Sequence, residues 1–127
     1  MVKILTLILG TILTLLGIFG FTSNSLIGMN APFVADTAHN ILHIVLGAIL
    51  LVVAFWSSKN CVLWLKIIGA ATFLLGLIGV LTIPSTGGEL LGVVTTNGAS
   101  NWFNLIAGVV IFIAGIYGKD PAADVIA

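Results

Sequence analysis

The chain alternates between long apolar stretches and short polar segments, a pattern typical of proteins that cross a membrane several times. A bilayer core about 30 Å thick is spanned by roughly 17–25 apolar helical residues. Four stretches reach that length, at residues 4–21, 38–56, 61–83 and 102–118. All three prolines fall between or after these stretches, where they leave the helices unbroken. The pattern therefore predicts a single all-α transmembrane domain, residues 1–127, built as a four-helix bundle.

The segments that connect the apolar stretches differ in length. Residues 57–60 are enough only for a tight turn, whereas residues 22–37 and 84–101 are long enough to hold structure of their own. Within these two long connections, residues 25–29 and 89–94 are short and apolar on one side. We expect each to form a short helix at the outer interface of the membrane.

Charged residues are too few for a soluble surface. They make up 6% of the 127 residues, four Lys and four acids with a net charge of zero, against roughly 25% in soluble domains. So few basic residues make no stripe for nucleic acid. Every lysine lies at the end of the bundle that carries the short turn, and neither long connection contains one. Because cytoplasmic loops are enriched in lysine, we expect both termini to lie in the cytoplasm. We expect the protein itself to lie in an inner membrane.

The two halves of the chain look like copies of one helical hairpin. The glycines of the first stretch recur in the third, 59 residues later, and share the sequence Leu-Leu-Gly before a second glycine. The second stretch carries Asn-x-x-His-x-x-x-Gly from Asn40, and the fourth carries Asn-x-x-Asn-x-x-x-Gly from Asn101. Two copies of a unit with an even number of spans have the same orientation, so their symmetry axis runs along the membrane normal.

This repeat sets boundaries within the domain. The first hairpin covers residues 1–58, the second covers residues 59–120, and residues 121–127 form a polar tail. The first apolar stretch could also be a secretory signal. However, it has a counterpart in the third stretch and no Ala-x-Ala cleavage site follows it, so we expect it to be a permanent helix.

Small residues recur seven apart in every span. Since lipid tails are as apolar as leucine, membrane helices associate through close backbone contact at small residues and through hydrogen bonds. A spacing of seven keeps the contact on one seam of a left-handed bundle. The glycines expected at these seams are Gly10, Gly17, Gly47, Gly69, Gly76, Gly108 and Gly115. Three more, Gly20, Gly79 and Gly118, are expected to contact outside partners.

Four polar side chains fall on the inward faces of the second and fourth spans, in the outer half of the membrane. They are Asn40, His43, Asn101 and Asn104. We expect them to form one polar cluster. Such groups fix the pairing of helices through hydrogen bonds worth roughly 0.6–2 kcal/mol. Our first interpretation is therefore that the cluster is structural. Polar groups inside membranes are also candidates for function.

Other functions remain as alternatives. His43, or His39 one turn earlier, could ligate a haem or a chlorophyll-type pigment, although haem usually needs histidines on opposing helices. His39 itself is expected near the outer interface, solvated or bonded to the loop backbone. An oligomeric transporter or pore is a further possibility, but no span contains a carboxylate or a break. No catalytic motif, metal-binding spacing or disulfide partner for Cys61 is present.

The element Asn40-x-x-His43-x-x-x-Gly47, on a second span that follows a glycine-rich first span, resembles an uncharacterised family of small four-helix bacterial membrane proteins, a domain of unknown function. The resemblance implies the fold and a bacterial inner membrane, and no activity. We therefore expect a non-catalytic accessory or scaffolding subunit that packs against other membrane proteins or against itself. We expect no cofactor, although a bound lipid would fit.

Overall fold

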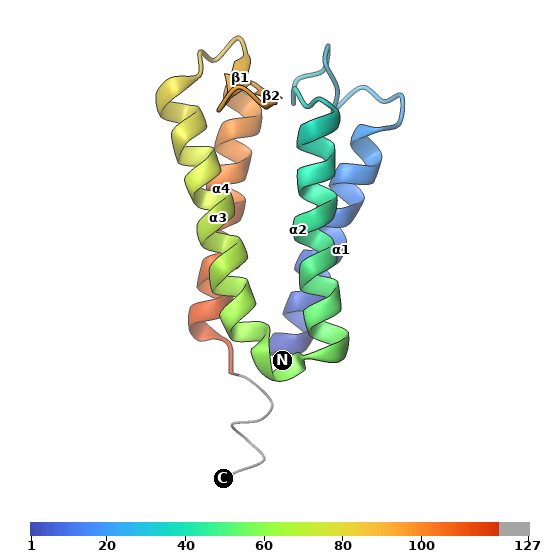
Figure 1. Cartoon of the computed structure of the whole chain (residues 1–127), viewed down its shortest axis with the longest axis vertical. Coiled ribbons are helices and arrows are strands. Elements are labelled where there is room, and N and C mark those ends of the chain that lie inside the picture. The colour runs from blue at the N-terminus through green and yellow to red at the C-terminus, as the bar shows by residue number, and fades with distance from the viewer. Residues whose placement is uncertain (120–127) are drawn as a thin grey trace.

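Four long helices account for most of the computed structural model, which describes residues 1–119 (Figure 1). In chain order the elements are α1 (Val2–Gly20), α2 (Thr37–Trp56), the short 3-10 helix η1 (Ser58–Asn60), α3 (Cys61–Thr82), β1 (Gly88–Leu90), β2 (Val94–Thr96) and α4 (Gly98–Tyr117). All four α-helices are long and apolar enough to cross a membrane. The protein is thus an integral membrane protein with a mostly helical fold. The expected tail, residues 121–127, lies outside the described residues.

The helices form two antiparallel hairpins that stand side by side (Figure 1). α1 packs along α2 and α3 packs along α4, while contacts between the two hairpins are sparse. One end of the bundle carries the N-terminus and η1, and we call it the turn end. The other carries two long loops, the first of residues 21–36 and the second of residues 83–97, and we call it the loop end.

The apolar core lies towards the turn end, where the two hairpins meet. Leu50 and Ala54 of α2, Cys61 and Leu65 of α3, and Ile111 of α4 are almost completely buried there. Large apolar side chains on the outward faces of the helices remain exposed, as expected for surfaces that lipid covers. The core thus holds the hairpins together at one end only, and the loop end must be joined in another way.

Glycines bring the two helices of each hairpin into backbone contact. A Cβ atom added at Gly17 of α1 would lie 2.5 Å from the Asn40 carbonyl oxygen of α2. One added at Gly76 of α3 would lie 2.8 Å from the Asn101 carbonyl oxygen of α4. Such distances leave no room for any larger residue. The same close contacts occur at the other glycines expected on the seams, which are Gly10, Gly47, Gly69, Gly108 and Gly115.

The three glycines expected to contact outside partners instead make contacts within the chain, so that expectation was wrong. Gly20 and Gly79 lie against the side chains of Asn40 and Asn101, respectively, and Gly118 lies against Val2. The asparagines explain the need for glycine at Gly20 and Gly79. An inward-facing amide near a helix end needs space on the partner helix, and only glycine provides it.

The two expected interfacial helices are absent from the described residues, and the second long loop is instead a β-hairpin. β1 and β2 pair antiparallel, with Glu89 opposite Thr95. Their turn needs left-handed backbone at Leu91 (φ 54°) and Gly92 (φ 70°), which no helix contains. The run of β-branched residues 93–96 favours a strand as well.

The first long loop also lacks a helix. Its only regular pairing within the described residues is an isolated bridge between Ile27 and Phe33. The Asn24 side-chain oxygen accepts hydrogen bonds from the backbone nitrogens of Leu26 (2.9 Å) and Ile27 (2.8 Å). A side chain that bonds to the nearby backbone in this way competes with helix formation.

The helix bounds differ most from the sequence prediction at α4, which begins four residues earlier than expected. Asn97 caps this helix, its side-chain oxygen accepting a hydrogen bond from the Ser100 backbone nitrogen at 3.1 Å. The first turn is polar, so apolar length alone missed it, whereas an asparagine at the cap position is a standard signal.

We predict that Gly76→Ala destabilises the protein by about 1–3 kcal/mol, the usual cost of overpacking, because its Cβ would lie 2.7 Å from the Leu105 Cα atom. Unfolding by titration with SDS measures this change. Thr11→Ala, on an exposed face of α1, is the control and should change little. Equal stability of Gly76→Ala and wild type would contradict the close contact.

Candidate functional site

Polar contacts join the two hairpins at the loop end. The Ser100 hydroxyl of α4 donates to the Val34 carbonyl oxygen of the first long loop at 2.8 Å. The Asn97 amide donates to the Pro32 carbonyl oxygen at 2.9 Å and accepts from the Val34 nitrogen at 3.3 Å. Because Asn97 also caps α4, one residue both starts that helix and holds the first long loop over it.

Asp36 makes a second connection between the hairpins. It caps α2, as expected, by accepting from the His39 backbone nitrogen at 2.9 Å. Partial burial raises the pKa of Asp36, but hydrogen bonds from the His39 backbone and from Thr95 outweigh this effect, and the pKa is lowered from its ordinary value of 3.8. The ionised carboxylate therefore stabilises the contact between α2 and the second long loop.

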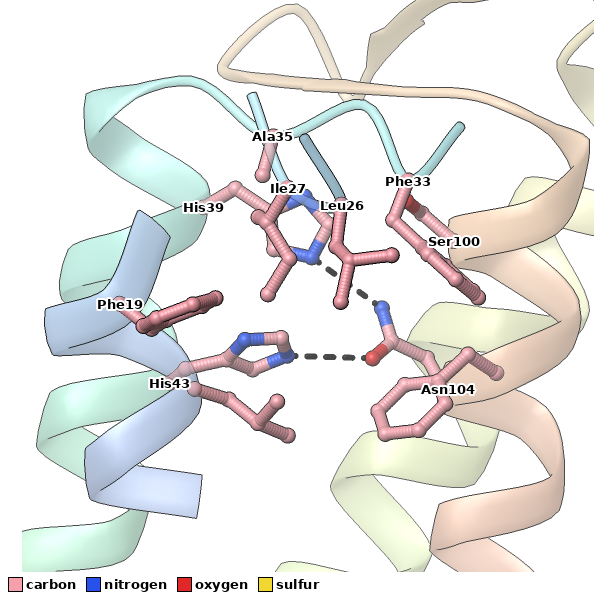
Figure 2. A pocket seen from close by; sticks show the side chains of 11 residues that line it. Phe19, Leu26, Ile27, Phe33, Ala35, His39, His43, Ser100 and Asn104 are labelled. Carbon is pink, nitrogen blue, oxygen red and sulfur yellow. Dashed lines mark hydrogen bonds between the residues drawn. The ribbon is translucent and has the colours of Figure 1, made fainter. Parts of the chain in front are cut away.

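Below this cap, a chain of side-chain contacts crosses from one hairpin to the other. His43 Nε2 of α2 lies 3.2 Å from Asn104 Oδ1 of α4, and Asn104 Nδ2 lies 3.4 Å from His39 Nε2 (Figure 2). His39 Nδ1 in turn lies 3.3 Å from the Thr95 carbonyl oxygen. His43 lies six residues into α2, which is about 9 Å from the helix start. This series of hydrogen-bonded side chains therefore lies within the membrane-spanning part of α2.

A cavity of about 260 Å³ lies beside this chain, between α1, α2, α4 and the first long loop. Its walls are mostly apolar, and the sequence provides no charged side chain among them. Figure 2 shows Leu26, Ile27 and Phe33 of the loop above the polar chain, with Phe19 of α1 at one side. The lining residues are Leu16, Phe19, Leu26, Ile27, Phe33, Ala35, His39, His43, Ser100, Phe103 and Asn104.

An apolar groove of about 270 Å³ lies next to the cavity and runs along the helices. α1 and α4 form its two walls, and Leu16 and Phe103 line both the cavity and the groove. Ile12 and Ile106, on opposite walls, are about half exposed. The groove is therefore open on the lipid-facing side of the bundle and adjoins the cavity at Leu16 and Phe103.

The structure brings together only two of the four residues expected in one polar cluster. His43 and Asn104 meet between the hairpins, whereas Asn40 and Asn101 stay within their own hairpins against Gly20 and Gly79. Asn101 is fully buried and accepts from the Thr96 hydroxyl at 2.9 Å. His39 is 2% exposed and bonds to the loop backbone, one of the two environments expected for it.

Several residues of the site were not predicted from the sequence. Thr95 lies far from His43 along the chain, and no local pattern predicts the path that places the lining residues of the first long loop over His43. Ser100 was predicted to lie outside the helix and therefore received no role. Its position four residues before Asn104, on the same face of a helix, would have identified it once the start of α4 was known.

The side-chain contacts observed at this site are hydrogen bonds. Among residues 1–119, no group of three or more His, Cys, Asp or Glu side chains could hold a metal ion. His39 and His43 lie on successive turns of α2 with ring centres 4.8 Å apart, so they do not face each other across a haem-sized gap. Axial ligation of a pigment by a single histidine stays one of the alternatives to the expectation of no cofactor.

Residues 3–117 match the family described as a domain of unknown function, DUF4383, and the chain therefore belongs to this family. The resemblance to an uncharacterised family is thus confirmed, and the structure has the four helices that it implied. No curated protein and no solved structure matches the chain.

We predict that acid weakens the loop-end contacts through Asp36. Because folding lowers the pKa of this carboxyl, its contribution is complete above the unfolded value of 3.8 and is lost as the pH falls through the folded value. Thermal stability in detergent, followed downwards from neutral pH, should fall in this range. Asp36→Asn still caps a helix but does not titrate, and it should flatten the profile; an unchanged profile would contradict this assignment.

Proposed function

We propose that this protein is a non-catalytic integral membrane subunit that holds a small amphiphilic molecule in its loop-end cavity. The observation that carries the proposal is the cavity itself, apolar over most of its walls and polar at the His43–Asn104 pair. Ligand sites are usually concave and apolar, with a few convergent polar groups and volumes of roughly 300–1,000 Å³. The cavity and its adjoining groove together fall in this range.

The lipid-facing opening supports a ligand that comes from the membrane. The groove between α1 and α4 is lined only by apolar residues, so it offers nothing to a polar solute. A pore or a transporter of ions would need a polar path across the bilayer, and the polar chain at the cavity lies only near the loop end. Storage or presentation of an amphiphilic molecule fits this geometry better.

We further propose that the two hairpins are copies of one unit, related by an axis along the membrane normal and packed as a left-handed bundle. Matched contacts support the duplication: Gly17 against Asn40 in the first hairpin corresponds to Gly76 against Asn101 in the second. The spacing of seven between small residues supports the hand of the bundle. In this view, the unit provided the helix pairing, and the cavity arose where the two copies meet.

For the partners, we propose other membrane subunits or a second copy of the chain, packed against the outward faces. These faces carry large exposed apolar side chains such as Leu74, Ile113 and Phe55. A partner seated over the α1/α4 groove would receive the ligand directly. The glycines do not support this interface, since those expected to be available contact residues within the chain.

For the location, we propose a bacterial inner membrane with the turn end in the cytoplasm. Lys3, near the start of α1, and Lys59, in η1, lie at the turn end and are exposed, and the two long loops contain no lysine. This distribution follows the enrichment of lysine in cytoplasmic loops.

The orientation predicts the labelling of single cysteines by a membrane-impermeant maleimide in intact cells. On a Cys61→Ala background, Asn30→Cys in the first long loop should react from outside, because Asn30 is exposed there. Lys59→Cys, exposed at the turn end, should react only after permeabilisation. The reverse pattern would contradict the proposed orientation.

The cavity predicts a bound amphiphile in protein extracted gently from its own membrane, detectable by native mass spectrometry. Leu16→Trp places a larger side chain where the cavity meets the groove, and it should reduce the bound fraction at least about tenfold, as expected for a clash of more than 1.4 kcal/mol. Leu15→Trp, on the neighbouring exposed position, is the matched control and should retain the ligand. Wild type without a bound amphiphile, or equal occupancy in both variants, would contradict the proposal.

A further inference from the structure

The hydrogen bonds at the polar end of the cavity have a fixed direction. The series of hydrogen bonds from Thr95 to His43 begins at the Thr95 carbonyl oxygen, which can only accept a hydrogen bond. His39 Nδ1 lies 3.3 Å from this oxygen, so Nδ1 carries the hydrogen. Neither ring is hydrogen-bonded to a carboxylate within residues 1–119, and a neutral imidazole has only one N–H. His39 Nε2 is therefore an acceptor.

Asn104 passes this direction on to His43. Its Nδ2 atom, 3.4 Å from His39 Nε2, donates, and its Oδ1 atom, 3.2 Å from His43 Nε2, accepts. His43 Nε2 thus carries the hydrogen of that ring, and His43 Nδ1 carries a lone pair. These tautomers are assigned from the hydrogen-bond pattern, and the opposite set would turn two lone pairs towards each other at Thr95.

One acceptor is left over at the end of the chain. His43 Nδ1 makes no hydrogen bond within the described residues. In Figure 2 this nitrogen lies on the side of the ring away from Asn104, towards Phe19, and both residues line the cavity. A ligand in the cavity that covers this nitrogen without donating a hydrogen bond to it would leave a buried acceptor unpaired, which weakens binding.

We propose that the molecule held here is a neutral long-chain amphiphile with a hydroxyl head, whose O–H donates to His43 Nδ1. The inference rests on the proposed function and specifies its ligand class. A charged head group would find no counter-charge among the lining residues and would lose its hydration. A ketone, ether or ester offers only hydrogen-bond acceptors, whereas a hydroxyl can donate the hydrogen bond that His43 Nδ1 would accept.

The tail of this amphiphile lies in the groove between α1 and α4. The groove begins at Leu16 and Phe103, which also line the cavity, and runs towards Val110 of α4. A linear chain can follow this route with its hydroxyl end at His43 and its other end in the lipid.

A competition between two isomers tests the head group. Deuterated hexadecanol and unlabelled methoxypentadecane have the same number of heavy atoms, but only the alcohol can donate. With both at equal mole fraction in the micelles, native mass spectrometry should find the alcohol bound about 5- to 100-fold more, the range expected when a buried acceptor is paired or unpaired. Equal binding would overturn the hydroxyl assignment and leave the cavity proposal standing, and binding of neither would overturn both.

Two variants connect this preference to the nitrogen. His43→Phe keeps a flat ring and removes the acceptor, so the ratio of alcohol to ether should fall close to one. Thr82→Ala, on an exposed position of α3 away from the cavity, is the control. The Thr82 hydroxyl donates to the Ile78 carbonyl oxygen within its own helix, so the preference should remain. A preference that survives His43→Phe would overturn the role of His43.

The histidine tautomers can be measured on wild-type protein without any ligand. This measurement therefore does not depend on whether the His43→Phe variant folds. Nitrogen NMR of wild-type protein with labelled histidine should show hydrogen on Nδ1 of His39 and on Nε2 of His43. Hydrogen on Nδ1 of His43 would overturn the proposal, because the site would then present a donor to the cavity.

Discussion

Polar side chains within the hydrocarbon of a membrane face the interior of the protein rather than the lipid, and the fold at the loop end follows from this constraint. Here, α2 and α4 each place amides or imidazoles inside their spans. Asn40 and Asn101 pack against glycines on the partner helix of their own hairpin, and Asn101 Oδ1 also accepts from the Thr96 hydroxyl. Asn40 Oδ1 and Asn101 Nδ2 have no hydrogen-bond partner among the described residues. His43 and Asn104 find each other across the gap between hairpins. The first pair thus builds the hairpins, and the second pair joins them.

The sequence predicted the features that depend on local pattern. The four spans, the cap at Asp36 and the glycines at the seams follow from hydrophobicity, helix signals and spacing. It failed for the long loops, because an amphipathic segment of a few residues fits a helix as well as a strand, and only the glycines and β-branched residues near Leu91 favour the hairpin. It also failed for the partners of Asn40 and Asn101, since the face that a polar residue shares with a seam does not reveal which helix it will meet.

The candidate site was half predictable for the same reason. His43 and Asn104 were found as polar residues in apolar helices, and their pairing follows from the matched positions in the two halves. The cavity walls come from the first long loop, whose path depends on contacts of Asn97 and Ser100 with residues more than sixty positions away. Contacts over that distance are set by the tertiary arrangement of the hairpins, which periodicity does not encode.

The lateral opening of the α1/α4 groove has a consequence for how the site would respond to its surroundings. A site that opens to water senses the dissolved concentration of its ligand. A site that opens between helices senses the composition of the leaflet beside it, because exchange occurs by diffusion in the plane of the membrane. Its occupancy would then follow the fraction of ligand among the neighbouring lipids, and even a weak site would fill when the leaflet is rich in that molecule. In that case the protein would act as a sensor of membrane composition.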